Sequence, residues 1–150
     1  MREAIRLSRS KMRRGDGGPF GAVVVKSGKI IARGWNCVTS ANDPTAHAEV
    51  MAIREACRKL KRFEISDCEL YTSCEPCPMC LAAIYWARLG EIYYANTRRD
   101  AARLDFDDDL IYRELARPIS RRRLSMRHLL RREALAVFEE WRAKADKIAY

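Results

Sequence analysis

The length, composition and charge of this chain limit the kind of protein it can be. Its 150 residues suit one domain, and a hydrophobic share of 48% is ordinary for a globular fold. No run is long and apolar enough to cross a membrane, and the charged residues 1–6 do not resemble a signal peptide. We therefore expect a single soluble, cytoplasmic domain over residues 1–150 with no membrane partner.

The net charge of +9 is unevenly distributed along the chain. Residues 1–42 carry nine basic and two acidic groups and residues 110–150 carry eleven and five, whereas residues 43–109 carry nine and thirteen. Basic ends can attract phosphate, so a nucleic-acid partner stays open. Solvated arginine-rich faces are the favoured interpretation, because no aromatic residues alternate with the arginines as a base-stacking surface requires.

The first half of the chain predicts two helices and a hairpin. An apolar face indicates a helix over residues 1–13, and a buried strand over 22–25 is joined by a Ser27-Gly28 turn to a strand over 30–35. A second helix is expected to begin near residues 42–45, with Asp43 as its cap and Pro44 in its first turn, and to run to Leu60.

The second half predicts three strands and three helices. Strands are expected over residues 69–72 and 91–95, and Pro78 opens a helix whose apolar run 81–87 indicates burial on all sides. A short helix over 107–115 precedes a basic connection over 117–132 with a strand near its end. Phe138, Trp141, Ala145 and Ile148 predict a last amphipathic helix. Alternating strands and helices indicate an α/β domain.

Two short motifs at helix starts carry the chemistry. His47 and the Cys77-x-x-Cys80 turn offer one imidazole and two thiols, which are three ligands of a tetrahedral zinc ion (Zn2+). A fourth position is then free for water, as in catalytic zinc sites. Zinc lowers the pKa of bound water to about 7, and Glu49, two residues after His47, is the expected base that takes the proton.

Other interpretations of the cysteines compete with this one. Disulfides are disfavoured in a cytoplasmic chain of this length, and crowded cysteines there indicate metal. Cys74 could close a purely structural four-ligand zinc site, although Glu49 would then have no role. An iron–sulfur site would need a further cysteine where Ile84 stands.

The His-x-Glu and Pro-Cys-x-x-Cys motifs resemble those of the cytidine deaminase superfamily. Nearly the whole chain is similar to one branch, the bacterial guanine deaminases. The matching segments are residues 17–22 (GGPFGA), 42–49 (NDPTAHAE), 71–80 (YTSCEPCPMC), 84–88 (IYWAR), 106–108 (FDD) and the terminal Tyr150. Residues 117–132 are far more basic than the resemblance leads one to expect.

The resemblance implies a three-layer α/β/α fold with a central mixed sheet of about five strands. It also implies a homodimer in which the C-terminal segment, about residues 115–150, is swapped and helps to close the partner's site. Phe20 should stack on a purine, and Asn36 and the Ala48 backbone N–H should hydrogen-bond its ring. Trp86 and Tyr150 should line or cap the pocket, and Asp108 should sit near the leaving amino group.

The function that this resemblance implies is hydrolytic deamination of guanine to xanthine and ammonia. A zinc-activated water attacks C2 of the purine, and Glu49 shuttles protons, with Asp108 assisting at the amine. Guanosine, another aminopurine, an amino-triazine and the adenosine of a tRNA remain alternative substrates. A non-catalytic binding module stabilised by zinc is the alternative from another class, and it would need four protein ligands.

Overall fold

The computed structural model describes residues 1–106 and 108–149. It divides into two compact units, Met1–Tyr112 and Arg113–Tyr150, and each is described by itself.

The first unit is built on a mixed sheet of four strands in the order β2-β1-β3-β4. Strand β1 (Gly21–Lys26) pairs antiparallel with β2 (Lys29–Trp35) through the Ser27-Gly28 turn, in which both residues have positive φ. Strand β3 (Cys68–Cys74) runs antiparallel to β1, and β4 (Glu91–Asn96) runs parallel to β3. The strands predicted over residues 22–25, 30–35, 69–72 and 91–95 are all present.

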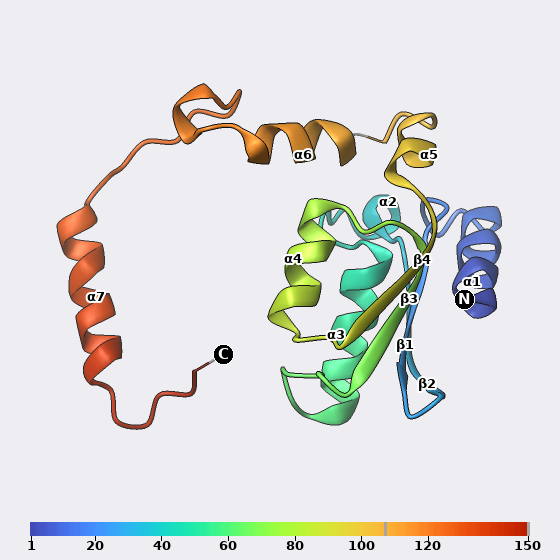
Figure 1. Cartoon of the computed structure of the whole chain (residues 1–150), viewed down its shortest axis with the longest axis horizontal. Helices are drawn as coiled ribbons and strands as arrows, with labels where there is room; N and C mark the ends of the chain where they lie inside the picture. Colours follow the sequence, from blue (N-terminus) through green and yellow to red (C-terminus); the bar gives the residue numbers. More distant parts are fainter. Residues whose placement is uncertain (107, 150) are drawn as a thin grey trace. The chain divides into compact units, whose positions relative to one another are not determined.

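Helices cover both faces of this sheet, which gives three layers (Figure 1). Helix α1 (Arg2–Arg13) packs on one face, where Leu7 meets Val23 and Val25. Helices α3 (Ala48–Leu60) and α4 (Pro78–Trp86) lie on the other face, over the larger apolar core. The predicted α/β/α class is confirmed, with four strands in the described sheet where about five were expected.

Three short helices complete the ordered connections of this part of the chain. These are α2 (Val38–Ala41), α5 (Arg98–Ala102) and α6 (Asp108–Ala116). Helix α6 matches the predicted short helix, whose residue 107 lies outside the described residues. Helices α2 and α5 were not predicted, although α5 begins with a capping box between Thr97 and Asp100 that the sequence contains.

The predicted start of the second helix is wrong. Helix α3 begins at Ala48 with His47 as its N-cap, five residues after Asp43. The Asp43 carboxylate instead accepts hydrogen bonds from the backbone N–H and hydroxyl of Thr45, at 2.8 and 2.7 Å. Asp side chains satisfy nearby backbone groups in this way in turns as well as at helix caps, and here the turn is formed.

The expectation that helix α4, which Pro78 opens, is buried on all sides is also wrong. Cys80 and Ile84 of α4 are buried, but Tyr85 is 70% exposed and Trp86 is 61% exposed. An all-apolar sequence gives no periodicity, so it cannot tell which face meets the core.

The second unit contains the 3-10 helix η1 (Ile119–Arg121) and helix α7 (Arg131–Ala143). The described part of the 117–132 connection holds no strand, so the strand expected there is absent. Helix α7 carries Phe138 and Trp141 of the predicted last helix, whereas Ala145 and Ile148 lie beyond its end. None of the helices in the described part of the chain could span a membrane.

Close contact between β2 and α3 depends on Gly34. A Cβ atom at this position would lie 2.1 Å from the Ala48 carbonyl oxygen and 2.4 Å from the Ala52 backbone nitrogen. Glycine within a strand marks such a close approach of two backbones. The first turn of α3 therefore lies directly against the sheet.

An ion-pair cluster ties α1 to the same strand. The Glu3 carboxylate accepts hydrogen bonds from Arg6 at 2.7 and 2.8 Å and from Arg33 of β2 at 2.8 Å. Hydrogen bonds from Arg6 and then from Arg33 lower the pKa of Glu3 to about 2.

We expect Gly34→Ala to destabilise the protein, because the added methyl group would meet backbone atoms that cannot rotate away. Such overpacking costs about 1–3 kcal/mol in the free energy of unfolding. Gly28→Asn is the matched control, since a Cβ atom there would meet nothing within 4 Å and Asn tolerates positive φ. Denaturant unfolding measures both variants, and equal stability of Gly34→Ala and wild type would contradict the close contact.

We expect the stability conferred by Glu3 to depend on pH. Because its pKa falls from 4.5 in the unfolded chain to about 2 in the folded protein, this stability is fully present above pH 4.5. It is lost as the pH falls toward 2. The difference in unfolding free energy between wild type and Glu3→Gln should therefore shrink between pH 4.5 and 2. A difference that stays constant over this range would show that the stability does not come from the ionised Glu3 carboxylate.

Candidate active site

Two helix starts bring together the three predicted metal ligands. His47 is the N-cap of α3, Cys77 is the N-cap of α4, and Cys80 follows in the first turn of α4. Among the described residues, these three form the one group of His, Cys, Asp or Glu side chains placed to hold a metal ion. Their ligand atoms lie within 4.8 Å of one another.

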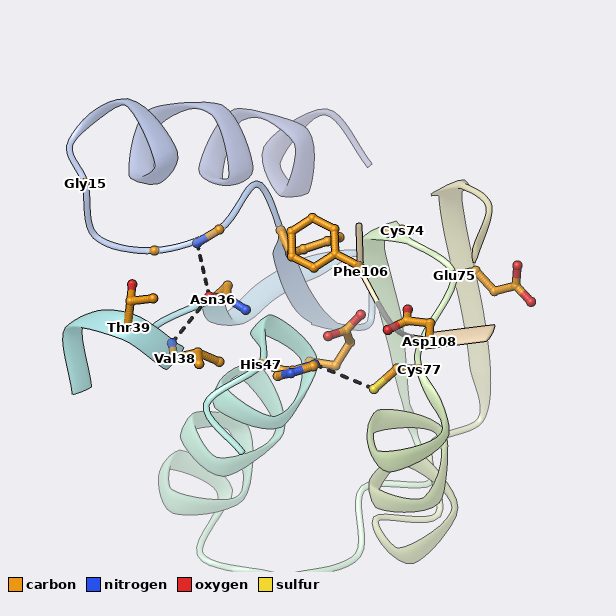
Figure 2. A pocket seen from close by; sticks show the side chains of 14 residues that line it. Gly15, Asn36, Val38, Thr39, His47, Cys74, Glu75, Cys77, Phe106 and Asp108 are labelled. Atoms are coloured by element: carbon orange, nitrogen blue, oxygen red, sulfur yellow. Dashed lines mark hydrogen bonds between the residues drawn. The ribbon is translucent and has the colours of Figure 1, made fainter. Parts of the chain in front are cut away.

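The donor set suits zinc. His47 Nδ1 and Cys77 Sγ are 3.6 Å apart, and Figure 2 shows the two side chains facing each other. One imidazole and two sulfurs are typical zinc ligands, and a structural site would add a fourth. Cys74 does not belong to this group: its thiol donates a hydrogen bond to the Thr97 carbonyl at 3.6 Å. The closed four-ligand interpretation therefore has no fourth residue in the described part of the chain.

The local charges favour a thiolate at Cys77. Hydrogen bonds from Cys80 and then from His47 hold the pKa of Cys77 well below its usual value. The same contact with Cys77 raises the pKa of His47, and the hydrogen bond to Cys77 raises that of Cys80. A helix N-terminus adds partial positive charge at this point. The site thus concentrates negative charge on sulfur, which a metal cation would neutralise.

Glu49 lies in the first turn of α3, beside this group and outside it. Its side chain is only 5% exposed, and burial raises the pKa of its carboxyl. Thr72 of β3 donates a hydrogen bond to Glu49 Oε1 at 2.7 Å. A buried carboxyl with a raised pKa is suited to accept a proton and then release it.

A cavity of about 590 Å³ opens over these residues. Its volume is within the range of small-molecule sites. The lining residues come from the loop before β1, the ends of β2 and β3, and the starts of α2, α3, α4 and α6. They are Gly15, Gly17, Gly18, Phe20, Asn36, Val38, Thr39, His47, Glu49, Cys74, Glu75, Cys77, Phe106 and Asp108.

Asn36 is held so that its amide nitrogen can serve a ligand. The side chain is 7% exposed, and its oxygen accepts hydrogen bonds from the backbone N–H groups of Gly18 at 3.1 Å and Val38 at 3.3 Å (Figure 2). A carbonyl oxygen has two lone pairs, so both are engaged. The part of Asn36 that remains for a ligand is its N–H donor pair.

Two aromatic rings and one carboxylate form another part of the wall. Phe20 and Phe106 meet edge to face, with ring centroids 4.8 Å apart and planes at 77°. Asp108 begins α6 and lines the same cavity, and its charge contributes to the raised pKa of His47. Figure 2 shows Asp108 at the end of the cavity that holds Cys77.

Some predicted site residues are not among those that line the cavity. Ala48 and the predicted metal ligand Cys80 are fully buried and are not among the lining residues. The first backbone N–H groups of a helix such as α3 have no partner within the helix. Trp86 ends α4 with most of its side chain exposed. Tyr150 lies outside the described residues.

Sequence reasoning gave no role to several residues that the structure places here. They are Thr72, which contacts Glu49, and the lining residues Gly15, Gly17, Gly18, Val38, Thr39, Glu75 and Phe106. Cys74, which was considered as a fourth zinc ligand, also lines the cavity. The sequence signal for Thr72 was a hydroxyl on the inward-facing side of a buried strand. For Phe106 it was the FDD segment.

The whole chain is similar in sequence and in structure to guanine deaminases. A guanine deaminase of Bacillus subtilis (strain 168) is 51% identical over 150 residues, covering 100% of this chain and 96% of its own. The solved structure of guanine deaminase from Bacillus subtilis superimposes with a TM-score of 0.96, covering 99% of this chain and 95% of that one. A guanine deaminase structure from Nitrosomonas europaea gives 0.68 at 32% identity, over 95% and 82%.

A more distant relative acts on RNA. A tRNA-specific adenosine deaminase of Aquifex aeolicus is 46% identical over 77 residues, which are 51% of each chain. The family model described as the cytidine and deoxycytidylate deaminase zinc-binding region matches residues 1–96, which contain His47, Glu49, Cys77 and Cys80. On this match, and on the full-length similarity, the chain belongs to the cytidine and deoxycytidylate deaminase family of zinc-binding proteins.

Proposed function

We propose that this protein is a zinc-dependent aminohydrolase that converts guanine and water to xanthine and ammonia. The observation that carries the proposal is the buried Glu49 carboxyl beside the His47, Cys77 and Cys80 group, at the base of a cavity with aromatic walls. Similarity to a guanine deaminase over the whole chain supports the choice of substrate.

His47, Cys77 and Cys80 would hold the zinc ion. When bound, zinc would lower the pKa of a water molecule to about 7 and so supply a nucleophile for the ring carbon that bears the amino group. Three protein ligands leave room for that water.

Glu49 moves the protons in this proposal. Its carboxylate accepts the proton of the attacking water and delivers it to the ring nitrogen next to the attacked carbon. It then takes the proton of the new hydroxyl on the attacked carbon and, with Asp108, passes it to the amine, which leaves as ammonia as the C–N bond breaks and the carbonyl forms. Burial raises the pKa of Glu49, which favours a group that serves first as base and then as acid.

The remaining cavity residues bind and orient the purine. Phe20 stacks on the ring, and the Asn36 amide and the Ala48 backbone N–H donate hydrogen bonds to ring acceptors. Asp108 lies near the leaving amino group. Because binding has already fixed the ring, less entropy is lost when the reaction reaches its transition state.

Two alternative functions can be tested in the same assay as guanine deamination. Deamination of tRNA adenosine is suggested by the Aquifex relative and by the seven arginines within residues 117–132. A non-catalytic zinc module would require a fourth protein ligand, and the described residues offer three.

We expect the zinc-loaded protein to release ammonia from guanine. The assay compares guanine, guanosine, adenine, cytosine, cytidine and a tRNA anticodon hairpin with adenosine at its wobble position. Turnover of guanine alone supports the proposal, and removal of zinc by a chelator should abolish it. Salt-sensitive turnover of the hairpin would move the substrate to RNA. No turnover of any compound would favour the binding module.

Glu49→Gln is the matched control for this assay. It keeps the size of the side chain and removes its ability to exchange a proton, so it should retain zinc and lose turnover by at least about 100-fold. Metal content by mass spectrometry checks the first expectation. Substantial turnover with zinc bound would exclude the proton-shuttle role of Glu49.

We further propose that two copies pair and exchange their C-terminal segments, about residues 115–150. Exposed apolar side chains in both units support this: Tyr85 and Trp86 on α4, and Phe138 and Trp141 on α7. Exposed aromatic side chains such as these are enriched in protein interfaces. In such a dimer the partner subunit's Tyr150 closes the site, and Trp86 lies at or near the contact.

The exchange predicts that two impaired chains restore one another. Glu49→Gln and Tyr150→Ala are each expected to be weakly active alone. After they are unfolded and refolded together, mixed dimers should contain one intact site, giving about a quarter of the wild-type rate for an equal mixture. Light scattering checks that the species is a dimer. Activity equal to the mean of the two separate variants would contradict the exchange.

A further inference from the structure

Thr72 stands in the middle of β3, on the face of the sheet that meets α3. Its side chain is 0% exposed, and its strand neighbours in register are Ala22 of β1 and Tyr94 of β4. Leu70, two residues earlier on the same face, belongs to the larger apolar core. A valine of the same shape would suit the packing at this position, so packing alone does not account for the hydroxyl.

The Thr72 hydroxyl makes one specific contact in the described part of the chain. It donates to Glu49 Oε1 at 2.7 Å, and both side chains are buried. This distance is at the short end for hydrogen bonds and is typical of a hydroxyl that donates to a carboxylate. The bond joins the sheet to the first turn of α3, between residues that are 23 positions apart.

A proton shuttle needs such a restraint. A glutamate side chain has several rotatable bonds, and a carboxylate that turns freely points its oxygens away from substrate for part of the time. The proposed reaction asks Glu49 to take a proton at one atom and deliver it at another. With Oε1 held by Thr72, the second oxygen keeps a fixed direction relative to the cavity that Glu49 lines.

We propose that Thr72 is a positioning residue for the deamination: its hydroxyl anchors Glu49 Oε1 and thereby orients the carboxylate toward substrate. The proposal rests on the function proposed for Glu49. It assigns to Thr72 no contact with substrate or metal, so its effect belongs to the rate of the bound complex rather than to binding.

The first test compares Thr72→Val with Thr72→Ser in the zinc-loaded, full-length protein. Valine keeps the shape and removes the hydroxyl, and serine keeps the hydroxyl. We expect Thr72→Val to lower kcat roughly 10- to 100-fold with KM and zinc content unchanged, because a small misplacement of a catalytic group has an effect of this size. Thr72→Ser should recover most of kcat. A kcat of Thr72→Val equal to wild type would overturn the proposal.

Ser73→Ala is the matched control on the opposite face of the same strand. Its hydroxyl accepts a hydrogen bond from the Gly21 backbone N–H at 3.0 Å, and Ser73 is not among the residues that line the cavity. The variant should lose stability and keep kcat. If Ser73→Ala lowered kcat as much as Thr72→Val, the effect would come from general damage to β3, and the positioning role would be wrong.

A double-mutant cycle tests whether Thr72 acts through Glu49. In the Glu49→Gln background, Thr72→Val should cause little further loss of kcat, because the group it positions is already disabled. Independent, multiplicative losses would contradict the proposal.

If Thr72→Val fails to fold, Thr72→Ala, which removes the hydroxyl without adding apolar contact, takes its place.

Crystal structures of the zinc-loaded wild type and Thr72→Val give a readout that does not depend on turnover. We expect one Glu49 rotamer in wild type. In the variant we expect the Glu49 carboxylate to be rotated or to occupy two alternate conformations. An unmoved carboxylate would overturn the positioning role even if the wild type deaminated none of the compounds. Failure of the proposed function shows itself separately, as an inactive wild type.

Discussion

The close approach of α3 to the sheet is the constraint on which the site depends. Because residue 34 has no side chain, the Ala48 carbonyl and the Ala52 nitrogen can lie directly against β2. This brings the first turn of α3 to the sheet end where β3 leads into α4. His47 and Glu49 then face Cys77 and Thr72 without any long loop to hold them. A site built on rigid elements in this way loses little precision to loop motion.

The same geometry brings buried acidic groups close to the donors and positive charges that stabilise them. Glu49 is buried, which raises its pKa, and the thiolate of Cys77 adds negative charge nearby. The helix N-termini, the His47 ring and the Thr72 hydroxyl oppose these effects with donors and positive charge. A zinc cation held by His47, Cys77 and Cys80 would complete the balance.

The sequence predicted the local parts of this arrangement and missed the parts that depend on distant segments. The ligand residues stand out because Cys77-x-x-Cys80 and His47-x-Glu49 each lie within one turn of a helix, where spacing decides direction. The Thr72–Glu49 contact and the Phe20–Phe106 pair join residues far apart in the chain, and no periodicity records them. The start of α3 was missed because Asp43 can cap a turn as well as a helix.

Most residues proposed to take part in the chemistry lie in the part of the chain that the family model matches. The family model ends at residue 96, and every residue proposed to hold zinc or move protons, apart from Asp108, lies before that point, as do Phe20 and Asn36. Phe106 and Asp108 lie after it and still line the cavity. The tRNA deaminase of Aquifex aeolicus matches half of this chain, whereas the guanine deaminase of Bacillus subtilis matches all of it. Residues 97–150 therefore lie outside the family model, and through Phe106 and Asp108 they add one ring and one carboxylate to the cavity wall, the kinds of group that set the shape and polarity of what can bind there.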